Sequence, residues 1–287
     1  MKPEGFGDVA ERLRRSTVQV LSGTRTSAGS GSGVIWTTTG TVITNAHVAR
    51  ESSALVELWD GRSFHADVIK RDDRADLAEL KLHTTDLPAI AWRDSSTLRS
   101  GELVVAVGNP LGFIGALTTG VVHLSGPIRG LGRRPWIQAA IRLAPGNSGG
   151  PLADAEGRVV GINTMVVPMV VPGGLALAIP SEGVLDFLKQ GRRPVLGVVV
   201  RPVVDSVSGP GLLVIEVTAN SPAARASLLI GDVLIGANGR NLTSAHVLGD
   251  EIDDAADAVL KLRFLRGDRR RVREVTAALA GSRREAA

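Results

Sequence analysis

The stretch Gly146-Asn147-Ser148-Gly149-Gly150-Pro151-Leu152 carries the sharpest signal in the sequence. Small residues on both sides of Ser148 let the backbone turn sharply and leave the hydroxyl exposed, and glycine lets peptide N–H groups point inward where a Cβ would obstruct. If the N–H groups of Gly146 and Ser148 converge on one point, they can hold the oxyanion of a tetrahedral intermediate. The alternative interpretation is a glycine-rich turn without chemistry, which a Gly/Ser cluster alone would favour.

The same residues also fit the Gly-x-Ser-x-Gly turn of α/β-hydrolases. In that fold the acid and the histidine follow the serine, and strands alternate with helices. Here the only histidine after Ser148 is His246, which lies in a different predicted domain, and helical patterns are scarce. We therefore give this class little weight.

A serine hydroxyl is a poor nucleophile until a base removes its proton, so a histidine is needed. The chain has five: His47, His65, His83, His123 and His246. His47 is set in Thr44-Asn45-Ala46-His47-Val48, directly after the apolar stretch Thr41–Thr44, where a loop leaving a strand can aim the side chain. Because a single histidine is by default a surface or capping residue, position alone leaves this assignment open.

The base in turn needs a buried carboxylate that fixes its tautomer and stabilises the imidazolium. Period-two alternation in Asp76-Leu77-Ala78-Glu79-Leu80-Lys81-Leu82 places Asp76 on the apolar face of a strand. A carboxylate there is unfavourable unless it finds a partner. Asp72 and Asp73 lie in the polar run Arg71–Arg74 and have the pattern of solvated loop residues, so Asp76 is the favoured orienting acid.

The composition indicates a mostly β protein long enough for two domains. The chain has 287 residues with 34 glycines and 14 prolines, and its Val, Thr and Ile pairs are typical of short strands joined by tight turns. It contains no cysteine, which excludes disulfides, thiolate metal sites and a cysteine nucleophile. We expect no metal and no organic cofactor.

The N-terminal sequence, an apolar run and the net charge of the chain bear on its cellular location and its binding partners. The start MKPEGFGDVAERLRR lacks the apolar core of a signal peptide, and the apolar run 164–180 is interrupted by proline and glycine. We expect no membrane span and a soluble, cytoplasmic protein as written, with the periplasm or cell envelope as the alternative if the natural start is missing.

The formal charge is +4, and arginines crowd 263–273. We interpret them as protection of an edge strand rather than a nucleic-acid site.

Strand-like segments fall into two series that suggest two small barrels or sandwiches. The first series is Thr17–Leu21, Gly33–Trp36, Thr41–Thr44, Leu55–Trp59, Ser63–Lys70 and Leu77–Leu82. The second is Leu103–Val107, Ala116–Ser125, Ile137–Ile141, Arg158–Thr164 and Leu175–Ile179, with a closing helix Glu182–Gln190. The polar turn 191–194 predicts a linker after a domain over 1–190. A second domain over 195–281 is predicted, with strands, a short helix and a helix opened by Thr243, before a tail at 282–287.

Together these residues resemble the HtrA/DegP family of trypsin-like serine proteases with a PDZ domain. The order His47, Asp76, Ser148 is similar to the family's order of base, acid and nucleophile. The matching motifs cover nearly the whole protease part: Thr44–Val48, Asp76-Leu77-Ala78, Gly108-Asn109-Pro110-Leu111-Gly112, Pro145–Leu152 and Ala178-Ile179-Pro180-Ser181. The resemblance implies a chymotrypsin-like pair of six-stranded β-barrels with the active site in the cleft between them.

The later domain also resembles the family. Val195-Leu196-Gly197-Val198 is similar to its carboxylate-binding loop, and the stretch from Gly211 to Gly239 matches its PDZ pattern. The resemblance implies a small α+β module that adds a peptide as an extra strand and holds its C-terminal carboxylate on backbone N–H groups, with Leu196, Gly197 and Val198 as contacts. The alternative is that Gly197 only makes a turn.

Two positions bear on specificity and assembly. Family members usually have a polar Asp-Ala-Ala-Ile-Asn stretch where this chain has Ala140-Ile141-Arg142-Leu143-Ala144. Arg142 lies six residues before Ser148, where trypsin-like folds place the floor of the pocket for the residue before the scissile bond. The family favours small aliphatic residues there, whereas Arg142 would favour an acidic side chain unless it turns outward to solvent. Members are commonly trimers joined by aromatic residues near the start, for which Phe6 is the candidate.

Three hypotheses follow for function. The first is an ATP-independent serine endopeptidase that cleaves unfolded or misfolded proteins through an acyl-enzyme, as in protein quality control and stress response. The second is a proteolytically silent peptide-binding or chaperone protein, against which the three intact residues count. The third adds that C-terminal peptides bound by the PDZ domain gate the protease.

Overall fold

The computed structural model describes residues 5–23, 29–109, 115–128, 131, 133–164, 175–189, 194–205, 209–255 and 259–279. The chain divides into two compact units. The first comprises Met1–Ile128 and Arg134–Lys189, and the second comprises Arg129–Arg133 and Gln190–Ala287. The predicted tail 282–287 and all of the predicted linker except Pro194 lie outside the described residues. The domain boundaries stay a prediction.

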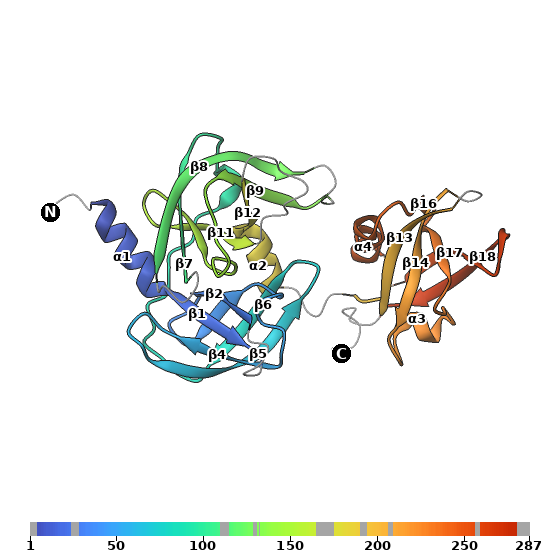
Figure 1. Cartoon of the computed structure of the whole chain (residues 1–287), viewed down its shortest axis with the longest axis horizontal. Coiled ribbons are helices and arrows are strands. Elements are labelled where there is room, and N and C mark those ends of the chain that lie inside the picture. The colour runs from blue at the N-terminus through green and yellow to red at the C-terminus, as the bar shows by residue number, and fades with distance from the viewer. Residues whose placement is uncertain are drawn as a thin grey trace. The chain divides into compact units, whose positions relative to one another are not determined.

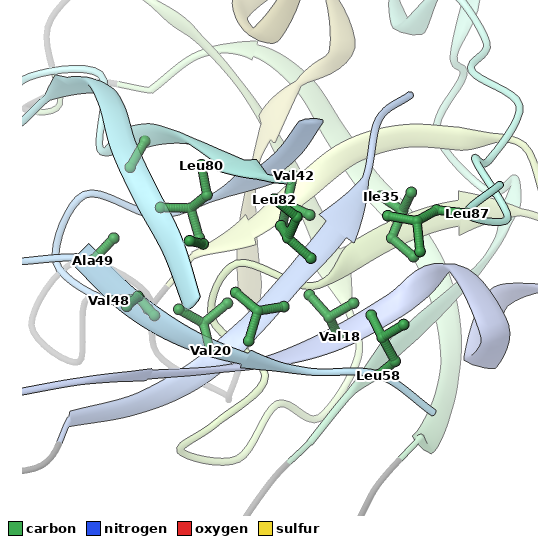
Figure 2. Packing of buried hydrophobic residues seen from close by; sticks show 14 residues of the cluster. Val18, Val20, Ile35, Val42, Val48, Ala49, Leu58, Leu80, Leu82 and Leu87 are labelled. Atoms are coloured by element: carbon green, nitrogen blue, oxygen red, sulfur yellow. The ribbon is translucent and has the colours of Figure 1, made fainter. Parts of the chain in front are cut away.

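The first unit begins with a closed barrel, shown in blue to cyan in Figure 1. Its strands pair in the order β1-β2-β3-β6-β5-β4. They are β1 (Thr17–Ser22), β2 (Gly29–Ile35), β3 (Thr41–Thr44), β4 (Ser53–Glu57), β5 (Ser63–Asp72) and β6 (Leu77–Leu82). Alternate residues of β1 and β6 point inward, and Figure 2 shows Val18, Leu80 and Leu82 meeting in a core where none of them is exposed to solvent.

A second closed barrel follows in the same unit, with the strand order β10-β11-β12-β9-β8-β7. Its strands are β7 (Leu103–Gly108), β8 (Ala116–Pro127), β9 (Pro135–Ala140), β10 (Pro151–Asp154), β11 (Val159–Thr164) and β12 (Ala176–Pro180). The two barrels confirm the predicted mostly β, chymotrypsin-like fold class.

Strand β10 was missing from the predicted series. All four of its residues are buried, so it lacks the alternation of apolar and polar residues that marks a half-buried strand. It also begins directly after the glycine-rich stretch that contains Ser148. That stretch therefore leads directly into a strand of the second barrel, so the turn around Ser148 is attached to a rigid element.

The two barrels share an apolar seam closed by helix α2 (Ser181–Lys189). Phe187 of this helix packs with Leu77 from the first barrel and Ile162 from the second. Burying such an aromatic side chain stabilises a fold by about 1.5–3 kcal/mol. The seam fixes how the barrels face each other, and so how residues from both can meet.

Helix α1 (Phe6–Ser16) covers the second barrel, with Val9 and Leu13 packed against Val105 and Val159. Its exposed face carries Glu11, which accepts hydrogen bonds from the guanidinium groups of Arg14 and Arg15. These bonds, Arg14 first, lower the pKa of Glu11 to about 2. The helix is therefore amphipathic, with Val9 and Leu13 on its buried face.

The second unit is a six-stranded antiparallel sheet with two helices. Its elements are β13 (Val198–Asp205), β14 (Gly209–Val217), α3 (Pro222–Arg225), β15 (Val233–Ala237), β16 (Arg240–Asn241), α4 (Ala245–Asp253), β17 (Val259–Arg266) and β18 (Asp268–Ala278). The path β13-β14-β15-β17-β18 leaves β13 at one edge. Helix α4 is capped by Ser244, whose hydroxyl accepts the N–H of Val247, rather than opened by Thr243 as predicted.

Candidate active site

His47 and Asp76 lie together at the ends of two neighbouring strands of the first barrel. The ring Nδ1 of His47 is 2.9 Å from both carboxylate oxygens of Asp76, and the His47 backbone N–H donates to Oδ1 at 3.1 Å. Both side chains are mostly covered, with 29% of His47 and 22% of Asp76 exposed. The carboxylate thus fixes the orientation of the imidazole and leaves Nε2 as the ring nitrogen directed elsewhere.

The structural reason for the position of Asp76 differs from the predicted one. The strand begins at Leu77, so Asp76 is not one of its alternating residues. Its backbone instead has a left-handed φ of 53°, which is uncommon for a residue other than glycine. The Asn45 side chain donates to the Asp76 carbonyl at 2.9 Å and helps to hold this conformation.

Thr164, at the end of β11, is a further partner of Asp76 that was not predicted from the sequence. Its hydroxyl donates to Oδ2 of Asp76 at 2.7 Å, across the seam between the barrels. A threonine that ends an apolar strand has no distinctive sequence signal. Its role depends on which residue the other barrel places opposite, and only the tertiary fold shows this.

The turn around Ser148 has a backbone that requires glycine. Gly146 and Gly149 have φ values of +103° and +86°. A Cβ on Gly149 would lie 2.0 Å from the Ser32 carbonyl oxygen and 2.3 Å from the Thr44 hydroxyl oxygen. The turn is therefore packed directly against strands of the first barrel, where no side chain fits at Gly149.

The same turn lies beside the loop that carries His47. A Cβ on Gly31 of β2 would be 2.6 Å from the side chain of Val48 and 3.0 Å from the Ser148 carbonyl oxygen. Ser148 therefore approaches the residue that follows His47 from the opposite barrel. Among the described residues, no hydrogen bond joins the half-buried Ser148 hydroxyl to the His47 ring.

Arg142 is exposed and lines a pocket of about 580 Å³ in the second barrel. The other lining residues are Leu117, Thr118, Thr119, Ala140, Ile141 and Leu175. The Thr118 hydroxyl is buried there and has no hydrogen-bond partner among the described residues. The pocket thus presents the Arg142 cation on walls of mixed polar and apolar character.

In the second unit, the predicted carboxylate-binding loop leads into the edge strand β13. Leu196 is buried, and its carbonyl accepts the N–H of Ala223 at 2.8 Å. Gly197 has a φ of +80°, and a Cβ there would lie 2.2 Å from Cβ of Ser221. Val198 is the first residue of β13, whose outer edge no described strand covers.

The described residues contain no group of three or more His, Cys, Asp or Glu side chains arranged to hold a metal ion. None of the helices that the structure describes is both long enough and apolar enough to cross a bilayer.

Known proteins match both units. Residues 31–162 match the model of the trypsin-like peptidase domain, and residues 194–276 match that of the PDZ domain. Human serine protease HTRA3 is 32% identical over 299 residues, which cover 90% of this chain and 65% of the relative. A probable periplasmic serine endoprotease, DegP-like, from Hahella chejuensis is 37% identical over 240 residues, which cover 77% of this chain and 50% of the relative. This chain thus spans between half and two thirds of these curated relatives.

Solved structures match along almost the whole chain. The serine endoprotease from Yersinia pestis has a TM-score of 0.66 at 25% identity, covering 98% of this chain and 100% of the other. The HtrA-type protease AlgW with a tripeptide has a TM-score of 0.63 at 28% identity, covering 96% of this chain and 97% of the other.

The barrels, the sheet and these matches define a trypsin-like peptidase domain of the serine endopeptidase class followed by a PDZ domain. Within that class, the chain belongs to the HtrA-type proteases.

Proposed function

We propose that the protein is an ATP-independent serine endopeptidase in which Ser148 is the nucleophile, His47 the base and Asp76 the orienting acid. The observation that carries the proposal is the 2.9 Å contact between Nδ1 of His47 and Asp76, beside the glycine-dependent turn that presents Ser148. A carboxylate in this place keeps the proton on Nδ1, which leaves Nε2 free to accept one.

In the first half of the reaction, Nε2 of His47 takes the Ser148 hydroxyl proton while Oγ attacks the peptide carbonyl. The carbonyl π electrons move to oxygen, and the N–H groups of Gly146 and Ser148 hold the resulting oxyanion. Each such donor contributes about 2.7–4 kcal/mol to transition-state stabilisation. Asp76 stabilises the imidazolium without taking its proton.

In the second half, the imidazolium gives its proton to the leaving amine as the C–N bond breaks, which leaves an acyl-enzyme. Water then attacks the ester carbonyl and loses a proton to His47. When the ester bond breaks, that proton returns to Oγ of Ser148, and the new carboxylic acid departs. No step requires a metal or an organic cofactor.

The substrates we propose are unfolded or misfolded polypeptides, because an endopeptidase needs an extended segment in its cleft. The PDZ unit is proposed to bind C-terminal peptides along β13, with the carboxylate held at Leu196, Gly197 and Val198. An edge strand with a free row of backbone groups can accept a peptide as an additional strand. In this proposal, peptide binding to the PDZ unit regulates the protease.

The pocket beside Arg142 is proposed to receive an acidic side chain of the substrate. The Arg142 guanidinium supplies positive charge at the pocket. A carboxylate in the pocket would pair with this charge, and a charge-assisted hydrogen bond is about twice as strong as a neutral one.

Assembly and location remain proposals. A homotrimer is proposed, with Phe6 at its contact, because 44% of this aromatic side chain is exposed at the start of α1. The predicted cytoplasmic location stays a prediction. The DegP-like relative is named as periplasmic, which supports the alternative location.

One observation favours a second candidate, a proteolytically silent peptide-binding or chaperone protein. The Ser148 hydroxyl makes no hydrogen bond to the His47 ring among the described residues, so the resting site lacks one contact of an active one. Catalytic hydrogen bonds of this kind often form only when substrate binds, which keeps the protease as the first proposal.

The test is the cleavage of unfolded casein by the full chain, with and without C-terminal peptides, compared with Ser148→Ala. Fragments of casein that appear with the wild type and not with Ser148→Ala support the endopeptidase. Absence of cleavage under all these conditions, together with suppression of casein aggregation by both proteins, supports the silent chaperone.

A further inference from the structure

Ser32, on β2, is fully buried and makes four hydrogen bonds around the turn that presents Ser148. Its sequence context, Gly31-Ser32-Gly33, carries no distinctive functional signal. It belongs to the first barrel, yet three of its four partners lie in the second barrel or in the turn itself. A single small residue thus contacts several of the segments that form the candidate site.

The side chain of Ser32 forms a short relay of hydrogen bonds. The Asn109 backbone N–H donates to Oγ at 2.8 Å, and the hydroxyl donates to the Gly146 carbonyl at 2.6 Å. A hydroxyl has one proton to give and accepts with its lone pairs, so both bonds are made at once. This relay fixes the peptide plane that follows Gly146.

The main chain of Ser32 holds two further groups. Its N–H donates to the Ser148 carbonyl at 2.8 Å. Its carbonyl accepts the Thr44 hydroxyl at 2.6 Å, three residues before His47. The N–H groups of Gly146 and Ser148 are the proposed oxyanion donors. The carbonyl groups of these same two residues are therefore both held by Ser32.

We propose that Ser32 is a positioning residue for the reaction: its hydroxyl holds the Gly146 carbonyl, in the peptide between the two oxyanion donors, so that the N–H groups of Gly146 and Ser148 and the Ser148 hydroxyl keep one fixed geometry. Ser32 acts through Gly146 and not on the substrate. The proposal rests on the proposed peptidase function. Small residues around it keep this geometry tight, since a Cβ on Gly150 would lie 3.2 Å from Cβ of Ser32.

The central variant is Ser32→Ala, which removes the relay and keeps both main-chain bonds. Ser30→Ala is the matched control, because Ser30 is on the same strand and exposed. Each protein is titrated with a fluorophosphonate to count active sites, and kcat and KM are measured per titrated site on a fluorogenic peptide that the wild type cleaves. Titration separates a geometric effect from a loss of folded protein.

For Ser32→Ala we expect kcat per titrated site to fall on the order of 10- to 100-fold, because small displacements of reacting groups have effects of that size. KM is expected to stay within about twofold, since uniform binding is untouched. The rate constant for fluorophosphonate labelling is expected to fall in parallel. A kcat per titrated site equal to that of Ser30→Ala would overturn the proposal.

If Ser32→Ala does not fold, Thr44→Val and Thr44→Ser carry the test. Valine removes the hydrogen bond to the Ser32 carbonyl, whereas serine retains it, so only Thr44→Val should lower kcat per titrated site. Equal kcat for these two variants would contradict the proposal. Failure of the proposed peptidase function is distinguished because the wild type itself would then neither cleave the peptide nor react with the fluorophosphonate.

Discussion

The hydroxyl of Thr164 donates a hydrogen bond of 2.7 Å to Oδ2 of Asp76, so the end of β11 in one barrel holds the carboxylate that precedes β6 in the other. The second oxygen of the same carboxylate accepts the backbone N–H of His47. Asp76 is thereby held from two sides, and its contact with the His47 imidazole holds that ring in a fixed orientation as well.

The first prediction concerns this contact. Thr164→Val keeps the shape of the side chain and removes the donor, so the carboxylate keeps His47 as its partner but loses one restraint. Because hydrogen bonds to charged groups contribute about 1.5–3 kcal/mol, we expect kcat for peptide cleavage to fall at least about tenfold. The exposed Thr38→Val is the control. Equal rates for the two variants would show that the contact has no role in catalysis.

The second prediction concerns the orienting acid. Asp76→Asn keeps the volume of the side chain, but an amide would favour the wrong tautomer of the imidazole, and a loss of kcat on the order of 10⁴-fold is expected. Asp73→Asn is the matched control from the loop before it. Steady-state kinetics at neutral pH measure both variants, and a full rate for Asp76→Asn would remove Asp76 from the mechanism.

The third prediction concerns specificity. Three peptides that differ only in Glu, Val or Lys before the scissile bond are compared by kcat/KM. The wild type should prefer Glu, Arg142→Ala should lose the preference, and Arg142→Glu should reverse it towards Lys because the charge in the pocket changes sign. A wild type without preference for Glu contradicts the proposed role of the Arg142 pocket in accepting this residue.

The fourth prediction concerns the glycine that packs against the first barrel. Gly149→Ala would place a Cβ 2.0 Å from the Ser32 carbonyl oxygen, whereas a Cβ on Gly61 meets nothing within 4 Å. Both glycines have left-handed φ values, so the two variants share a backbone penalty of about 1–2 kcal/mol. We expect Gly149→Ala to lower the melting temperature further and to abolish fluorophosphonate labelling. Similar behaviour of the two variants would mean that the close approach is unimportant.

The fifth prediction concerns the PDZ unit. Gly197→Ala would bring a Cβ 2.2 Å from Ser221, while a Cβ on Gly209, also at a left-handed φ, has open space. Binding of C-terminal peptides, measured by calorimetry, should be lost in Gly197→Ala and retained in Gly209→Ala. A C-terminally amidated peptide should bind weakly to the wild type, because the carboxylate is the group held. Unchanged binding in Gly197→Ala would place the peptide elsewhere.

Much of the fold could be predicted because alternation and turn residues are local signals. Strands with one buried face, such as Leu77–Leu82, lie at their predicted positions. Strand β10 was missed because it has only four residues, begins with a proline and shows no alternation. The pattern around Asp76 was misinterpreted because a left-handed residue precedes the strand. Both errors occur where tertiary packing overrides the local pattern.

The partners in the candidate site were less predictable than its principal residues. His47, Asp76 and Ser148 stand in distinctive local motifs, so the resemblance to a family could identify them. Thr164 and Ser32 are single polar residues in strands, and their contacts join segments far apart in the chain. No local pattern encodes such a pairing, so these residues required the structure.

The most direct measurement is intact-protein and peptide mass spectrometry after reaction with a fluorophosphonate. One covalent adduct is predicted on Ser148 in the wild type, with much slower labelling of His47→Ala and none of Ser148→Ala. A wild type that cleaves casein but carries the adduct on another residue, or that labels equally fast without His47, would contradict the account.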